Sequence, residues 1–174
     1  SVRAHIDQIV REYLDDPQPI LLSGDEYRVE NIHNVIYHTV DAYPKPRNLL
    51  YMVEMEEPES AIVFCNTRAD TSLVTAVLNR HGYDAELINA DLPQNDRERV
   101  MGKAKRGEVR FLVATDIAAR GIDVDDISHV LNFELPNEPQ SYVHRIGRTA
   151  RAGKAGVAIS FCDESESAYL RDIE

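Results

Sequence analysis

The sequence predicts an α/β fold built on a parallel sheet, and three observations lead to this prediction. From Val35 onward, short apolar runs alternate with stretches of helical periodicity about ten residues long. Connections of that length carry the chain across one face of a sheet and return the next strand in the same direction. The chain has 174 residues, 43% of them hydrophobic, which is enough for one domain with a core.

The first residues do not follow this alternation. Val2–Leu14 carries apolar residues at helical spacing and predicts an amphipathic helix, which Pro17 ends. Ile20–Leu22 predicts a short strand, and Ser23–Asn31 predicts a polar connector. An apolar helix stripe without a partner is exposed to water, so we expect residues 1–24 to pack against a neighbouring molecule or to be loosely held.

Short apolar runs predict the strands of the sheet. In chain order they are Val35–Val40, Ile62–Cys65, Ala85–Ile88, Phe111–Ala114, His129–Phe133 and Val157–Phe161. Helical spacing between the strands predicts helices over Arg47–Met55, Ala69–Arg80, Asp96–Lys105 and Pro139–Arg148. Gly82 is placed to close the helix that ends at Arg80.

The charge balance restricts how this chain could bind nucleic acid. Its formal net charge of -11 at pH 7 argues against binding through general attraction to phosphates. Any such site must therefore be local. Two basic stretches could provide one, Arg97–Arg110 and Arg145–Lys154.

The two cysteines, Cys65 and Cys162, lie in apolar runs and lack metal-ligand spacing. We expect both to be buried small hydrophobic residues in a reducing compartment, and we expect no metal site. No apolar run is long enough to span a membrane, and no signal-peptide pattern is present. These features predict a cytoplasmic protein.

Polar motifs follow three of the predicted strands. Asn66-Thr67-Arg68 follows Cys65, Thr115-Asp116 follows Ala114, and Tyr142–Arg151 lies beyond Phe133. Ligands of open parallel sheets bind beyond the carboxyl ends of the strands. Three such motifs in one chain therefore predict a binding site at this edge.

The segment Tyr142–Gly153 has an arginine at every third position, Arg145, Arg148 and Arg151, with no acidic residue among them. A helix over Pro139–Arg148 would put Arg145 and Arg148 on one face. Guanidinium groups stay charged and match phosphate oxygens, so the cluster predicts a phosphate site. The alternative is a solvated basic face, which the glycine-rich, acid-free surroundings in an acidic chain disfavour.

Two motifs, ATDIAARGID at Ala114–Asp123 and HRIGRTARAG at His144–Gly153, resemble the C-terminal RecA-like lobe of the DEAD-box RNA helicases. AIVFCNTR at Ala61–Arg68 is similar to motif IV of that family, and Gln94 with Arg97 is similar to its QxxR element. The resemblance implies a RecA-like parallel sheet with helices on both faces. It also implies the tail of an N-terminal lobe in residues 1–24, an interlobe linker in 25–34 and the C-terminal domain in 35–174.

The resemblance further implies a nucleotide site shared between two lobes. Arg148 and Arg151 would reach the triphosphate, with Arg148 as the arginine finger, and Gly121 and Asp123 would contact the nucleotide at phosphate and ribose. Asp123 could instead be a turn residue that caps backbone amides. ATP and Mg²⁺ would be held mainly by the other lobe.

Three residues would couple the two lobes by the same resemblance, namely Arg120, His144 and Arg145. For Arg120, a local ion pair with Asp116 is the competing interpretation. For His144, the pattern is equally compatible with a side chain that only hydrogen-bonds to a neighbouring group.

The resemblance implies RNA contacts at Asn66, Thr67, Arg68, Gln94, Arg97 and Thr115. Such groups bind sugars and phosphates and give little sequence specificity. Thr115 could alternatively cap the turn that begins at Asp116. Tyr142 could stack on a base, although core packing suits it better.

The chain contains neither a Gly-x-x-x-x-Gly-Lys-Ser/Thr phosphate loop nor an Asp-Glu-Ala-Asp run. We therefore expect the lobe alone to be inactive and to need the N-terminal lobe, with which the complete enzyme would unwind or remodel RNA. Two alternatives remain: the lobe of a DNA helicase or translocase, and a non-catalytic module that docks a partner or self-associates through residues 1–24.

Overall fold

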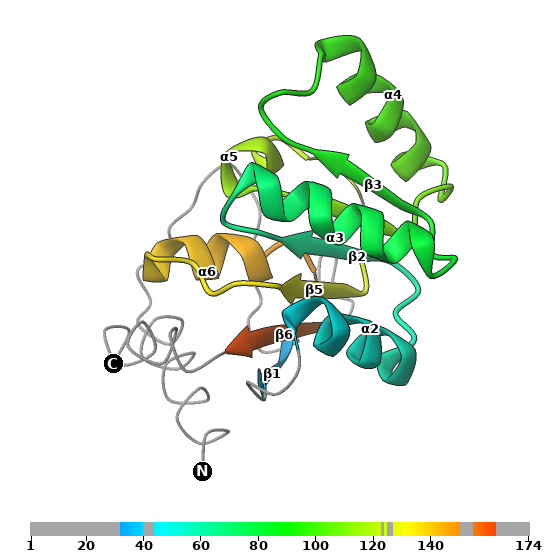
Figure 1. Cartoon of the computed structure of the whole chain (residues 1–174). Helices are drawn as coiled ribbons and strands as arrows, with labels where there is room; N and C mark the ends of the chain where they lie inside the picture. Colours follow the sequence, from blue (N-terminus) through cyan, green and yellow to red (C-terminus); the bar gives the residue numbers. More distant parts are fainter. Residues whose placement is uncertain (1–31, 40–43, 123, 125–126, 150–154, 163–174) are drawn as a thin grey trace.

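The computed structural model describes residues 32–39, 44–122, 124, 127–149 and 155–162. In these residues six strands form one sheet in the order β1-β6-β5-β2-β4-β3 (Figure 1). The strands are β1 Ile32–His38, β2 Ala61–Phe64, β3 Ala85–Ile88, β4 Phe111–Ala114, β5 His129–Asn132 and β6 Gly156–Cys162. Every pairing between neighbouring strands is parallel, which confirms the predicted sheet.

The helices cover both faces of this sheet. They are α2 Lys45–Glu56, α3 Arg68–Arg80, α4 Gln94–Lys105, α5 Asp116–Ala119 and α6 Pro139–Ile146. The central strands are apolar and fully buried, because layers of helices exclude water from both sides. The predicted RecA-like architecture with helices on both faces is thus confirmed.

Alternate residues of each strand point to opposite faces and so divide the core in two. On one face, Leu49 of α2 and Val74 of α3 pack in a cluster with Val63 and Val113. On the other face, Ile62 and its neighbours form a cluster with residues of α4 and α5. Helix α6 packs on that second face too, since it contacts Ala158, which pairs with Val130 of the same face.

Local signals explain where α3 begins and ends. Thr67 precedes the helix in extended geometry, and its hydroxyl accepts a hydrogen bond from the backbone N–H of Asp70. After the helix, Gly82 adopts φ +84°, a left-handed conformation that favours glycine. Gly82 therefore closes α3 as predicted, and the helix delivers Thr67 and Arg68 to one edge of the sheet.

The structure differs from the sequence-based elements in a few places. Strand β1 begins at Ile32, so residues 32–34, which we assigned to the linker, belong to the sheet. Helix α5 replaces what looked like a turn, and α6 ends at Ile146, two residues before Arg148. The predicted helix, strand and packing of residues 1–24 lie outside the described residues.

The expectations for the two cysteines and for Tyr142 are met. Both Cys65 and Cys162 are buried. Tyr142 packs in the core, and its hydroxyl donates to Oδ1 of Asn34 at 3.2 Å. Burial raises the pKa of Tyr142 to about 12. Among the helices that the structure describes, none is both long and apolar enough to cross a bilayer.

Candidate functional site

The polar motifs meet at one edge of the sheet, beyond the carboxyl ends of its strands (Figure 1). Asn66–Arg68 follow β2, Thr115 and α5 follow β4, and Glu134 follows β5. These three strands are neighbours in the order β5-β2-β4. The sheet topology therefore brings motifs far apart in the sequence to one place, as the sequence predicts.

Arg145 of α6 is the centre of this edge, because it is 1% exposed and all its contacts lie within the lobe. Its Nε and one terminal nitrogen donate to the two carboxylate oxygens of Asp116 at 2.7 and 2.8 Å. The same nitrogen donates to Oδ1 of Asn66 at 2.7 Å. The other terminal nitrogen donates to Asn132 Oδ1 at 3.3 Å and to the carbonyl of Glu134 at 2.7 Å. All five guanidinium N–H groups are thus used.

These bonds join the ends of three strands to helix α6. A buried charge of this kind is tolerated because its counter-ion and its hydrogen bonds are complete. The Arg145 guanidinium also stacks 5.2 Å from the centroid of the Phe64 ring. We call the group formed by Arg145, Asp116, Asn66 and Asn132 the rim clamp.

The rim clamp corrects two sequence-based interpretations. Arg145 does not share an exposed anion-binding face with Arg148, because its guanidinium points into the lobe and is saturated there. Asp116 pairs with Arg145, so the alternative pairing of Asp116 with Arg120 is wrong. Arg148 lies just beyond α6, partly exposed, and its Nε donates to the carbonyl of exposed His144 at 3.4 Å.

The loop Asn66–Arg68 is held by contacts at each of its residues. The Asn66 backbone N–H donates to Glu134 at 3.1 Å, and its side-chain amide donates to the carbonyl of Leu135 at 2.9 Å. Thr67 caps α3, and Arg68 forms an exposed ion pair with Asp91. Because exposed ion pairs exchange readily, Arg68 is the member of this loop best able to turn to a phosphate.

The segment from Thr115 to Gly121 presents polar backbone at the same edge. Thr115 precedes α5, and its side chain makes no capping hydrogen bond, so the proposed capping role of Thr115 does not hold. Gly121 is exposed with φ +76°, and no atom lies within 4 Å of the position that a Cβ would take. Arg120 is exposed, whereas Asp123 and Arg151 lie outside the described residues.

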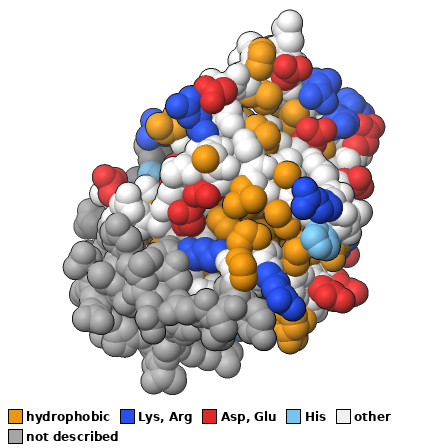
Figure 2. Space-filling model, in the orientation of Figure 1, with side chains coloured by type: hydrophobic (Ala, Val, Ile, Leu, Met, Phe, Trp, Pro, Cys, Tyr) orange, Lys and Arg blue, Asp and Glu red, His pale blue; other side chains and the backbone are white. Residues whose placement is uncertain are grey.

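The basic stretch Arg97–Arg110 lies on helix α4 and the residues after it, and three of its cations are paired with acidic residues. Arg99 and Lys103 pair with Glu86, and Arg106 pairs with Glu108. Figure 2 shows basic and acidic side chains side by side over this region.

At the start of this helix, Gln94 hydrogen-bonds Glu98 at 3.2 Å, and Arg97 donates to the carbonyl of Arg120 at 3.1 Å. Arg97 therefore links α4 to the segment between α5 and Gly121. Among the described residues, no group of three or more metal-ligating side chains could hold an ion.

Glu134 is a titratable residue of this edge that the sequence motifs do not single out. Burial and a hydrogen bond with the Asp70 carboxyl raise the pKa of Glu134 to about 7, although the Asn66 amide and Lys45 oppose this shift. Its proximity to Asp70 depends on the pairing of β2 with β5, which is a tertiary contact.

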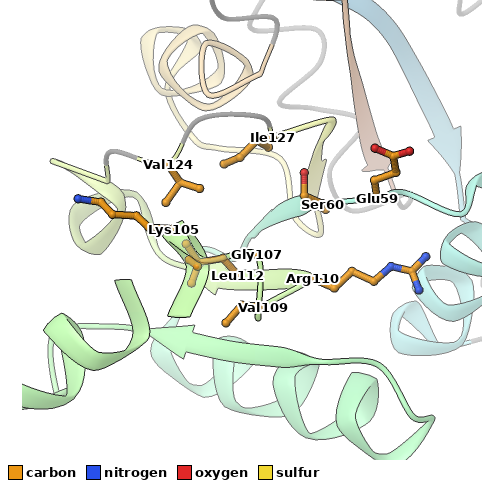
Figure 3. Close-up of a pocket in the computed structure, with 11 residues that line it drawn as sticks. Glu59, Ser60, Lys105, Gly107, Val109, Arg110, Leu112, Val124 and Ile127 are labelled. Atoms are coloured by element: carbon orange, nitrogen blue, oxygen red, sulfur yellow. The ribbon is translucent and has the colours of Figure 1, made fainter. Parts of the chain in front are cut away.

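The hollow in Figure 3 lies at the opposite edge of the sheet. It has a volume of about 270 Å³ and is lined by residues that include Ser60, Arg110, Leu112 and Ile127. Ser60 and Arg110 immediately precede β2 and β4, so the hollow is separated from the rim clamp by the length of those strands.

The comparisons with known proteins agree with this geometry. Residues 44–153 match the family described as helicase conserved C-terminal domain. The DEAD-box ATP-dependent RNA helicase CshA of Bacillus licheniformis is 42% identical over 174 residues, which is 100% of this chain and 36% of that protein. This chain therefore spans about a third of the length of that relative.

Two solved structures extend the comparison. The Escherichia coli DEAD-box protein SrmB, bound to regulator of ribonuclease activity A, has a TM-score of 0.76 at 36% identity, covering 82% of this chain and 84% of that chain. Domain 2 of the DEAD-box helicase Mss116p, bound to an RNA duplex, has a TM-score of 0.69 at 28% identity, covering 83% of this chain and 59% of that chain. By its sheet, its motifs and these matches, the chain belongs to the DEAD-box RNA helicase family and is a C-terminal RecA-like lobe.

Proposed function

We propose that this chain is the C-terminal half of a two-lobed, ATP-dependent RNA helicase and that ATP and RNA bind in the cleft between the lobes. The observation that carries the proposal is the rim clamp. Arg145 bonds to both Asp116 and Asn66. It thereby connects the segment that carries Arg148 to the segments that carry Thr115 and Arg68. Among the described residues, groups suited to a nucleotide and groups suited to RNA therefore lie at one edge of the sheet.

The nucleotide role falls to Arg148 and Gly121 of this edge, together with Arg151 and Asp123, which lie outside the described residues. Arg148 would place its guanidinium against the transferred phosphoryl group, with Arg151 as a second cation. In related nucleotidases an arginine delivered from a second domain contributes about 10³ to 10⁵ in rate. Gly121 would allow the backbone to approach the nucleotide closely, and Asp123 would accept hydrogen bonds from the ribose. ATP and Mg²⁺ would be bound mainly by the N-terminal lobe.

The RNA role falls to Arg68, Thr115, Gln94 and Arg97, with Asn66 and Thr67 shaping the loop. Thr115 has a hydroxyl that is not used in capping, and Arg68 has an exchangeable partner. Contacts of this kind hold sugars and phosphates and do not read bases. The RNA duplex bound to domain 2 of Mss116p supports RNA binding by a lobe of this type.

Closure of the lobes would couple the two sites. Arg120 and His144 are exposed at the edge and suited to contact a second lobe. Arg145 would act indirectly, because all its donors are already occupied within the lobe. A movement of α6 would shift Asp116 and Asn66, to which Arg145 is bonded. ATP-driven closure would then bend and separate short RNA duplexes, and the lobe alone would be inactive.

RNA and DNA binding by the chain separates this proposal from a DNA helicase lobe. The chain should bind a short RNA duplex more tightly than the matching DNA duplex at equal ionic strength, because ribose 2′-hydroxyls add contacts. Arg68→Ala and Arg97→Ala should weaken RNA binding, with Arg106→Ala as a control on an exposed pair outside the edge. Equal binding of RNA and DNA would favour the DNA helicase lobe.

A docking module is the second candidate, and the complex of SrmB with regulator of ribonuclease activity A favours it. A docking module needs neither Arg148 nor Asp123 for its activity. RNA-stimulated ATP hydrolysis by the two-lobe protein, compared for the parent and Arg148→Ala, separates the two candidates.

A further inference from the structure

We propose that Glu134 is a positioning residue for the loop Asn66–Arg68, and that RNA binds this loop more tightly when the Glu134 carboxyl, which lies beside Asp70, holds a proton. The inference rests on the RNA-binding role proposed above. It adds a residue outside the sequence motifs and a dependence of RNA affinity on pH.

Glu134 holds the start of the loop. Glu134 follows β5 and Asn66 follows β2, and these two strands are paired in parallel register. The Glu134 carboxylate accepts a hydrogen bond from the Asn66 backbone N–H at 3.1 Å. The Asn66 side chain donates to the next residue, Leu135, at its carbonyl. The beginning of the loop is therefore fixed to Glu134 and Leu135.

Asp70 closes the other end of the same loop. The Asp70 backbone N–H donates to the Thr67 hydroxyl at 3.1 Å, and that hydroxyl donates to the Asp70 carboxylate at 2.8 Å. Asp70 also shares a side-chain hydrogen bond with Glu134. A hydrogen bond between two carboxyl groups requires a proton on one of them, because carboxylate oxygens only accept.

The surroundings of the Glu134 carboxyl allow its proton to leave near neutral pH. Burial, together with Asp70, raises the pKa of Glu134 to about 7. One cation, Lys45 from α2, acts on the Glu134 carboxyl and opposes the rise in its pKa. Arg145 from α6 bonds the backbone carbonyl of Glu134. Arg145 gives its remaining donors to other groups, two of them to the Asp116 carboxylate.

Cys65, which precedes Asn66, also faces this cluster. Burial and the charges of Glu134 and Asp70 raise its pKa far above neutrality, so it stays an uncharged thiol. Glu134 is thus the group of this cluster that gains charge as pH rises through neutrality.

The consequence for RNA follows from the sign of the charge. Above pH 7 the pair carries two negative charges beside a loop that faces phosphates, and it loses the hydrogen bond that joins Glu134 to Asp70. Below pH 7 one charge is neutralised and the loop is held from both ends. By linkage, RNA binding takes up a proton, and affinity should fall about threefold to tenfold between pH 6 and pH 8.5.

The test measures binding of this chain to a short RNA duplex from pH 6 to pH 8.5 at constant ionic strength. Glu134→Gln retains an acceptor for the Asn66 N–H and offers a permanent donor to Asp70. It should bind at pH 8.5 as tightly as the parent does at pH 6, with little pH dependence between. The control, Glu138→Gln, removes an equal charge from an exposed side chain that caps nothing, and should keep the parental slope.

If the RNA affinity of Glu134→Gln depended on pH as steeply as that of the parent, this inference would be overturned and the proposed function would remain intact. Absence of RNA binding at every pH would instead defeat the proposed function and this inference together. A second measurement needs no RNA: the Asn66 backbone amide should titrate with a midpoint near pH 7 in the parent and should not titrate in Glu134→Gln. An Asn66 amide that is flat in the parent would also overturn the inference.

Discussion

Arg145 and Asp116 form a two-pronged ion pair, with donor-to-acceptor distances of 2.7 and 2.8 Å. They lie 29 residues apart in sequence, on α6 and α5. The arginine side chain is completely buried, whereas the aspartate side chain is 38% exposed. The pair therefore acts from inside the lobe, fixing the position of the segment that carries Arg148 relative to the segment that carries Thr115.

The first prediction concerns the stability that this pair provides. Arg145→Ala removes all five hydrogen bonds and leaves Asn66, Asn132 and the Glu134 carbonyl without their donor. Breaking a buried pair in this way costs about 3–5 kcal/mol in the free energy of unfolding. Urea denaturation of the chain measures it. Arg148→Ala is the control and should change the unfolding free energy little, so equal losses in both variants would contradict a special role for Arg145.

The second prediction compares alanine substitutions at two glycines, which should change the stability of the chain in opposite directions. Gly121→Ala should destabilise the chain by about 1 kcal/mol, because φ +76° strains any residue with a Cβ although space is available. Gly102→Ala should stabilise it by about 0.5–1 kcal/mol, because Gly102 lies within helix α4. There the new Cβ meets only the mobile end of Arg106 at 3.2 Å. Thermal unfolding of both variants measures the direction of each stability change. A change in the same direction in both variants would contradict the left-handed conformation of Gly121 or the helical position of Gly102.

The third prediction concerns the dependence of stability on pH. The pKa of Glu134 is raised from 4.5 to about 7 in the folded chain, so the folded state holds this proton more tightly than the unfolded state. The resulting stability is complete below pH 4.5 and is lost as pH rises through 7. Glu134→Gln avoids that loss and should be more stable than the parent by about 1–2 kcal/mol at pH 8, after allowance for partial exposure.

Denaturation of the parent and Glu134→Gln at pH 4.5 and pH 8 measures this difference. The gain should disappear at pH 4.5, where the parental carboxyl is protonated. If Glu134→Gln were more stable than the parent by the same amount at both values of pH, packing and not the proton would be responsible for the difference.

The fourth prediction concerns thiol reactivity. Cys65 is completely buried and burial raises its pKa, so almost no thiolate is present at pH 8. Cys162 is also buried. A thiol reagent should therefore modify the native chain only as fast as the chain opens, and both thiols at once in denaturant. Rapid modification of Cys65 in the native chain would contradict its placement in the core.

The strands were predictable because both faces of each are covered, which makes them continuous apolar runs such as Phe111–Ala114. Helix α5 was not predictable in this way, because four residues are too few to show a helical period. The edge that carries the site followed from the parallel topology alone.

The side-chain partners at that edge could not be read from spacing. Helical periodicity places Arg145 and Arg148 near each other, but it does not say that Arg145 turns inward to Asp116. Asp116 has Arg120 as its near neighbour in sequence, yet it pairs across the fold. Glu134 was missed for the same reason, since its contacts with Asn66 and Asp70 depend on how β5 lies beside β2.

The fifth prediction concerns the role of Arg148 in ATP hydrolysis. The chain is joined to a matching N-terminal RecA-like lobe, and RNA-stimulated ATP hydrolysis is compared for the parent and Arg148→Ala. We expect the variant to lose two or more decades in turnover while it keeps RNA and ATP binding, because an interaction made only in the transition state has been removed. An unchanged turnover would contradict the proposed role of Arg148 and would favour the docking module.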